Sequence, residues 1–250
     1  MTTYKTCVFC DRNDSRPSRE DILARWIARE FENIEWEVTN VETQKTFKTV
    51  GKLGLISKKP CERCNNGWMA KLEAAAKPIL IPLMDGENKQ LTTEQQHLIV
   101  AWLIKIVILY ELLSERIAYF QASERHGLMK SLSIPDGILV FLARYYGPTP
   151  ISTTETPVPL IIRSENKPED SVSAQGYSVT IVIKQLALQV FVLNKPKELL
   201  TSRVNVKIGR GWNDFTVQLW PIIGDASWPP RYTLTNDHQL DRFTNRWSNV

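Results

Sequence analysis

The chain has 250 residues, of which 43% are hydrophobic and 23% are charged, as is ordinary for a globular protein of one large domain or two modest ones. Its 31 basic and 27 acidic residues leave a net charge of +4, which permits nucleic-acid binding without requiring it. The N-terminus lacks the apolar core of a secretory signal, and the longest apolar stretch, 98–113, falls short of the ~20 residues that span a membrane. We therefore expect a cytoplasmic protein with no membrane segment.

All four cysteines fall into two pairs of identical spacing, Cys7–Val–Phe–Cys10 and Cys61–Glu–Arg–Cys64. Two such pairs, brought together, form a closed tetrahedral zinc site with Zn–S distances of about 2.3 Å. Disulfide bonding is the alternative, but paired Cys-x-x-Cys in a chain without a secretory signal favours a metal. A zinc ion with all four positions filled does no chemistry and stabilises a small fold that has little core of its own.

The segment between the cysteine pairs has two patterns. Ser18 stands before Glu20 and Asp21 as a helix-capping serine does, and apolar residues recur at helical spacing over 22–31, so a helix is expected there. Residues 34–56 are rich in β-formers with glycine turns, which predicts a hairpin leading to the second cysteine pair.

A helical region follows the second cysteine pair. Residues 65–77 contain good helix formers, and Pro78 is expected to end or kink that helix. Thr92 or Thr93 can cap a long helix that is apolar nearly all round, which predicts a buried central helix, and 123–131 form a shorter one.

From Ile138 onward, runs rich in valine, isoleucine and aromatic residues alternate with turn residues, as in antiparallel strands. The predicted fold is α+β, with a zinc-bound N-terminal module, a helical middle and an antiparallel β-rich C-terminal part. The expected boundaries are 1–85, 86–135 and 136–250.

The zinc module resembles the HNH endonuclease family in its zinc-stabilised ββα-metal form. The similarity rests on Cys-x-x-Cys, then Ser–Arg–Glu–Asp–Ile–Leu–Ala–Arg–Trp over 18–26, then Cys-x-x-Cys–Asn–Asn–Gly–Trp–Met over 61–69. It is closer to a branch of uncharacterised bacterial proteins, whose pattern Lys77–Leu83 and Trp220–Pro221 also fit. The specific part covers about a third of the chain, residues 7–85.

The resemblance implies a second, catalytic metal site with oxygen ligands. By position, Glu20 and Asn65 correspond to ligands of a Mg²⁺ or Mn²⁺ ion, which prefers such hard donors. The family has a general-base histidine where this chain has Asp21. Because a carboxylate is a weaker base than imidazole at neutral pH, the resemblance with this change implies slower phosphodiester hydrolysis, or a second metal bound by the carboxylate.

Basic residues gather between 45 and 63, and Lys58, Lys59 and Arg63 are the predicted phosphate contacts, with DNA the favoured partner. Three hypotheses stay open: an active metal-dependent nuclease, a catalytically inactive HNH-like protein that binds nucleic acid or a protein partner, and a zinc-stapled structural subunit. In the third, Glu20 and Asp21 are only helix-start acids. A role in phage defence follows from the kind of family alone.

Overall fold

The computed structural model describes residues 6–31, 36–39, 46–49, 56–113, 119–163, 171–194 and 210–247. The chain's internal contacts divide it into two compact units. The first unit comprises Met1–Glu73 and Lys105–Ser131, and the second comprises Ala74–Ile104 and Leu132–Val250. The boundaries expected at 85 and 135 stay a prediction.

Two segments on either side of the β-rich insertion lie together in the first unit. Strand β1 (Glu20–Asp21) pairs antiparallel with β4 (Ile56–Ser57), so that Glu20 lies opposite Ser57. The Ser18 hydroxyl donates to the carbonyl of Pro60 at 3.1 Å instead of capping a helix. The helix predicted over 22–31 is therefore wrong in extent, because the pairing with 56–60 holds its first turn extended, and α1 spans only Arg25–Arg29. The hypothesis that Glu20 and Asp21 are helix-start acids is wrong for the same reason.

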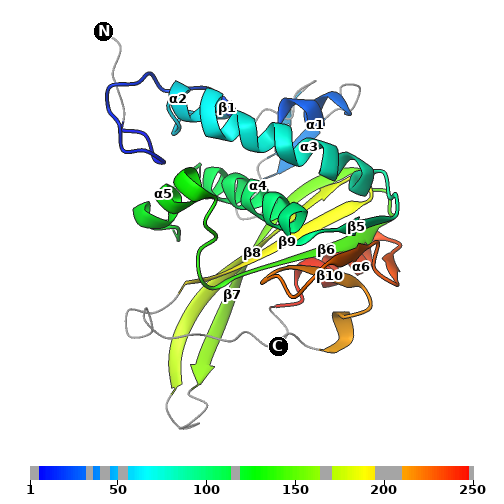
Figure 1. Ribbon diagram of the computed structural model, residues 1–250. Helices are drawn as coiled ribbons and strands as arrows, with labels where there is room; N and C mark the ends of the chain where they lie inside the picture. The colour runs from blue at the N-terminus through cyan, green and yellow to red at the C-terminus, as the bar shows by residue number, and fades with distance from the viewer. Residues whose placement is uncertain are drawn as a thin grey trace. The chain divides into compact units, whose positions relative to one another are not determined.

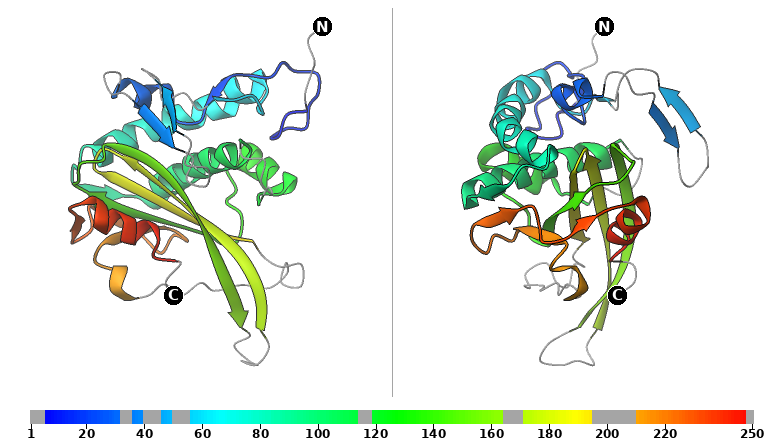
Figure 2. Two further views of the ribbon diagram at one scale, coloured as in Figure 1. Left: turned by 180° about the vertical axis from the view of Figure 1, so that it is seen from behind. Right: turned by 90° about the vertical axis from the view of Figure 1, so that its right-hand side faces the viewer.

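The hairpin predicted over 34–56 is confirmed by β2 (Trp36–Thr39) and β3 (Thr46–Thr49), which pair antiparallel as a separate two-stranded ribbon (Figure 2).

The helical segment after Pro60 bends at Gly67, whose φ of −96° and ψ of −106° are not helical. Helix α2 (Glu62–Cys64) leads through a wide π-type turn, η1 (Asn65–Met69), into α3 (Ala70–Met84). Wide turns of this kind occur often at functional sites. The helix does not end at Pro78 but continues to Met84, and the alternative of a kink at Pro78 stays a prediction. Burial of one apolar face compensates for the missing backbone hydrogen bonds, and this face comprises Leu72, Ala76, Leu80 and Leu83.

The central helix forms as predicted. Helix α4 (Thr93–Glu111) begins with a reciprocal cap, in which the Thr92 hydroxyl accepts from the Gln95 amide at 3.2 Å and the Gln95 side chain accepts from the Thr92 amide at 3.1 Å. Its residues from Ile99 to Leu109 are all buried, as the apolar pattern requires. Helix α5 (Ala122–Ser131) confirms the shorter helix. In the described part of the chain, no helix is both long enough and apolar enough to cross a membrane.

The second unit is built on a six-stranded, mostly antiparallel sheet with the order β10-β6-β9-β8-β7, to which β12 adds beside β6. Strands β7 and β8 continue together beyond the ends of their neighbours (Figure 1). A two-stranded ribbon of β5 and β11 completes the strands of this unit. The bounds are β5 Lys89–Leu91, β6 Ile138–Tyr145, β7 Ile151–Arg163, β8 Ser171–Ile183, β9 Leu186–Asn194, β10 Thr216–Trp220, β11 Ala226–Trp228 and β12 Thr233–Leu234.

A buried polar network ties α6 (Asp237–Thr244) and the residues after it to the sheet. The Gln189 side chain donates to the Thr180 hydroxyl and to the carbonyls of the last two residues of α6. Its oxygen accepts from Arg246 Nε at 2.7 Å and from Trp247 Nε1 at 3.0 Å. The Arg246 guanidinium lies 4.4 Å from the centre of the Phe141 ring, and burial lowers its pKa to about 9. The α+β class, the helical middle and the antiparallel β-rich C-terminal part are thus confirmed.

Candidate metal centre and active site

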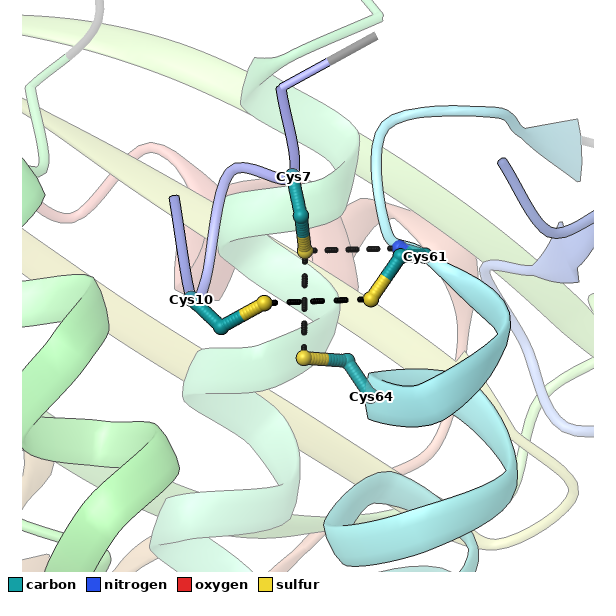
Figure 3. A group of neighbouring side chains, drawn as sticks. All are labelled: Cys7, Cys10, Cys61 and Cys64. Carbon is teal, nitrogen blue, oxygen red and sulfur yellow. Dashed lines mark hydrogen bonds between the residues drawn. The ribbon is translucent and has the colours of Figure 1, made fainter. Parts of the chain in front are cut away.

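The four cysteine side chains point toward one another (Figure 3). Their sulfur atoms all lie within 4.8 Å of one another, with Cys7 Sγ 3.7 Å from Cys64 Sγ and Cys10 Sγ 3.8 Å from Cys61 Sγ. A regular tetrahedron with a metal–sulfur bond of about 2.3 Å has edges of about 3.8 Å, whereas a disulfide bond is about 2.05 Å long. All four thiols are free. The cluster is therefore consistent with a structural zinc site and excludes the disulfide alternative in this structure.

Backbone turns and amide hydrogen bonds hold the two cysteine pairs in place. After Cys10 the chain turns through Asp11, whose φ is +53°, and the Asp11 amide donates to the Cys7 carbonyl at 3.0 Å. In the second pair, the Cys61 amide donates to Cys7 Sγ at 3.3 Å. Amide donors directed at sulfur stabilise a thiolate. The two pairs are joined by backbone bonds, including Glu62 N to Arg16 O at 2.9 Å.

The contact between Cys7 and Cys64 shifts the pKa values of the two thiols in opposite directions. The hydrogen bond with Cys64 is the main cause that lowers the pKa of Cys7 to about 4, and the same contact raises the pKa of Cys64. Because zinc binds thiolates, its binding to this cluster would release the protons of the thiols.

Helix α5 packs against the first cysteine pair within the first unit. Arg125 Nε donates to the Val8 carbonyl at 2.9 Å, and His126 Nε2 lies 2.9 Å from Asp11 Oδ2. Met129 Sδ lies 3.9 Å from Cys64 Sγ. These contacts fix the turn that carries Cys7 and Cys10, and they engage His126 in a structural role.

A cavity of about 280 Å³ lies where β1, α1 and the π-type turn meet. It brings together all three residues that the sequence predicted for catalysis: Glu20, Asp21 and Asn65. The rest of its lining is Arg19, Ala24, Arg25, Trp26, Asn66 and Glu73. The convergence accompanies the gathering of the four cysteines, since Asn65 directly follows Cys64 and β1 follows the first cysteine pair.

A buried lysine holds two of the cavity's carboxylates. Lys105, which is fully buried on α4, donates from Nζ to Glu73 Oε1 at 2.6 Å and to Glu20 Oε1 at 3.1 Å. Burial is the main effect on Glu20 and raises its pKa, while the charge of Lys105 opposes that rise. Glu20 therefore lies in the cavity wall with a cation already beside it.

Asp21 has a cation of its own. Arg25 Nε donates to Asp21 Oδ2 at 2.7 Å, in an i,i+4 pair in which the arginine side chain is 77% exposed. Such exposed pairs are weak, so the contact does not fix Asp21 against a competing ligand.

The predicted phosphate contacts Lys58, Lys59 and Arg63 are exposed on the segment around the second cysteine pair. None of the three is among the described residues that line the cavity. Side chains of residues 45–55, which include the other lysines of this basic stretch, lie outside the described part of the chain.

Sequence reasoning missed Glu73 and Lys105. Lys105 carried a signal, because it is the one charged residue within the apolar run Leu98–Leu109, and a charge in a buried helix face needs a partner. Glu73 carried none, since it sits among alanines and lysines on a helix that begins with polar residues. Among the described residues, the cysteines form the one group of three or more histidine, cysteine or acidic side chains close enough to share an ion.

Comparison with models of known protein families, with characterised proteins and with solved structures finds no match.

Proposed function

We propose that this protein is an HNH-like, metal-dependent endonuclease that hydrolyses phosphodiester bonds in nucleic acid, with DNA the favoured substrate. The observation that carries the proposal is the cavity in which Glu20, Asp21 and Asn65 meet. Two further features support it: the order of two paired strands, β1 and β4, followed by a helix, and the cysteine cluster at the junction. In the ββα-metal resemblance, β1 and β4 would be the two strands, and α1, β2 and β3 would be inserted between them.

The donors around the cavity suit a hard divalent cation. Carboxylate oxygens from Glu20 and an amide oxygen from Asn65 are ligands of the kind that Mg²⁺ and Mn²⁺ prefer over soft thiolates. When bound, such an ion stabilises the leaving 3′ oxygen and the charge that develops on the scissile phosphate.

The chain's own residues would divide the remaining tasks. Asp21, at the position of the family's histidine, would accept a proton from the attacking water, and it must exchange its contact with Arg25 to do so. Arg19 and Arg25 at the cavity, together with Lys58, Lys59 and Arg63, would bind flanking phosphates.

Cleavage of plasmid and single-stranded DNA in Mg²⁺ or Mn²⁺ tests the proposal. Glu20→Gln and Asn65→Ala are expected to abolish cleavage, whereas Glu94→Gln and Asn88→Ala, which change exposed residues that do not line the cavity, should cut like the wild type. Circular dichroism should show the same fold in all variants. Equal cleavage by all five proteins, or no cleavage by the wild type, would refute the proposal that the protein is an endonuclease.

A second function is favoured by the cations already present beside the acids. Lys105 and Arg25 place positive charge where a divalent ion would act, which suits a non-catalytic relative that binds nucleic acid or a protein partner. Gel shifts over a range of salt concentrations distinguish phosphate binding, since the logarithm of affinity should fall with the logarithm of salt, and Lys58→Ala with Arg63→Ala should reduce the slope. Salt-independent binding would point to a protein partner.

A further inference from the structure

Lys105, which contacts two carboxylates of the cavity lining, has no part in the ligand roles proposed above. It is fully buried, and its ammonium contacts two carboxylates from different parts of the chain, Glu20 on β1 and Glu73 on α3. All three residues belong to the first unit.

The charges in this cluster do not balance. A buried ammonium needs one carboxylate for neutrality, and Lys105 has two. Asp21, Arg19 and Arg25 also line the cavity, so its three carboxylates are balanced by Lys105 and the two arginines, and Lys105 is the cation in contact with Glu20 and Glu73. A divalent cation that enters the cavity therefore meets both attraction from the carboxylates and repulsion from an ammonium fixed behind them.

We propose that Lys105 is a counter-ion built into the cavity, which competes with the divalent ion for Glu20 and Glu73 and so sets the metal affinity. It is a positioning residue, because it acts through the carboxylates it holds, and Glu73 is a further metal-facing acid. The inference rests on the proposed function only in taking this cavity as the place where the ion binds.

Removing the ammonium while keeping the side-chain volume tests the competition. Lys105→Met leaves two partly buried carboxylates without their cation, and a divalent ion would take its place. We expect Mn²⁺ to bind this variant about 10- to 100-fold more tightly than the wild type, the usual size of an effect from a group that touches metal ligands. Mn²⁺ should also raise its unfolding temperature more than it raises that of the wild type.

The measurement is a Mn²⁺ titration of zinc-loaded protein into the millimolar range, followed by the electron paramagnetic resonance signal of free Mn²⁺. Lys71→Met, an exposed lysine on α3, is the matched control and should bind Mn²⁺ like the wild type. Zinc content measured in parallel shows that the cysteine site is equally filled in each protein. Unchanged or weaker Mn²⁺ binding by folded Lys105→Met overturns the proposal.

Glu73→Gln provides a test that keeps Lys105 and therefore does not depend on whether Lys105→Met folds. It removes one of the two competing carboxylates and is expected to weaken Mn²⁺ binding about tenfold or more. An unchanged Mn²⁺ affinity in Glu73→Gln overturns the proposal. Combined with Lys105→Met, the substitution should cancel much of the gain, because the two residues are in direct contact.

The outcome separates this proposal from the enzymatic one. Altered Mn²⁺ affinity in these variants without cleavage by any of them refutes the nuclease and supports the counter-ion. Cleavage by the wild type with unchanged Mn²⁺ affinity in both variants refutes the counter-ion and leaves the nuclease.

Discussion

Replacing Cys10 by serine is expected to weaken metal binding and to destabilise the first unit. Cys10 is the least buried of the four cysteines, and its sulfur lies 3.8 Å from Cys61 Sγ. The substitution therefore removes one ligand with little change in packing.

The size of the effect follows from the geometry. The two measured sulfur separations, 3.7 and 3.8 Å, match the edge of about 3.8 Å expected for four thiolates about 2.3 Å from zinc. Structural zinc contributes about 10–16 kcal/mol to zinc-finger-sized folds, so one ligand in four corresponds to about 3 kcal/mol. For a chain of this length that is a fall of about 10 °C in unfolding temperature.

Mass spectrometry of the dialysed protein measures its zinc content. Thermal unfolding, followed by circular dichroism, measures the loss of stability. The wild type should carry one zinc ion per chain, and Cys10→Ser should carry less and melt lower. Asn13→Ala, an exposed change in the same turn, is the control and should match the wild type. The metal centre would be contradicted if the wild type carried no zinc. It would also be contradicted if Cys10→Ser unfolded at the same temperature as the wild type.

Three further substitutions test the cavity and the core. Burial raises the pKa of Glu20 above its ordinary 4.5, so just above that pH the folded protein holds a proton that the unfolded chain has lost. The wild type should therefore lose unfolding free energy relative to Glu20→Gln as the pH rises from about 4.5 through this window, and the opposite slope in denaturant titrations would contradict the shift. Gln189→Leu removes the oxygen that accepts from the buried Arg246 and Trp247 donors. It should lower the unfolding free energy by about 4 kcal/mol. A loss below about 1 kcal/mol in denaturant titrations would show that these donors find other partners. Asp21→His places an imidazole at the base position and should raise the cleavage rate about 100-fold. An unchanged rate in single-turnover assays would show that Asp21 does not occupy the base position.

The features that depend on neighbours in sequence could be predicted from the sequence. Cys-x-x-Cys spacing predicts a pair of ligands because both thiols come from one turn, and the Thr92 cap and apolar run of α4 act within one helix. Even the joining of the two cysteine pairs follows from the number of thiols a zinc ion needs.

Features that depend on distant segments could not be predicted in this way. Ser18 and Glu20 have the local pattern of a helix start, but pairing with Pro60 and Ser57 holds them extended. In α3, Pro78 lacks an amide donor, yet burial of the helix face outweighs that loss. The lysine that contacts Glu20 of β1 lies far along the chain, at Lys105 of α4, and no spacing rule connects the two.

The most direct test is anomalous diffraction, recorded at the zinc and manganese edges, from crystals soaked in millimolar Mn²⁺. It tests the claim that the cavity beside the cysteine cluster holds a second metal. The account predicts a zinc peak among the four cysteine sulfurs and a manganese peak in contact with Glu20 and Asn65. A zinc peak with no manganese in the cavity would contradict the catalytic metal site, and the absence of zinc from the cysteines would contradict the whole account.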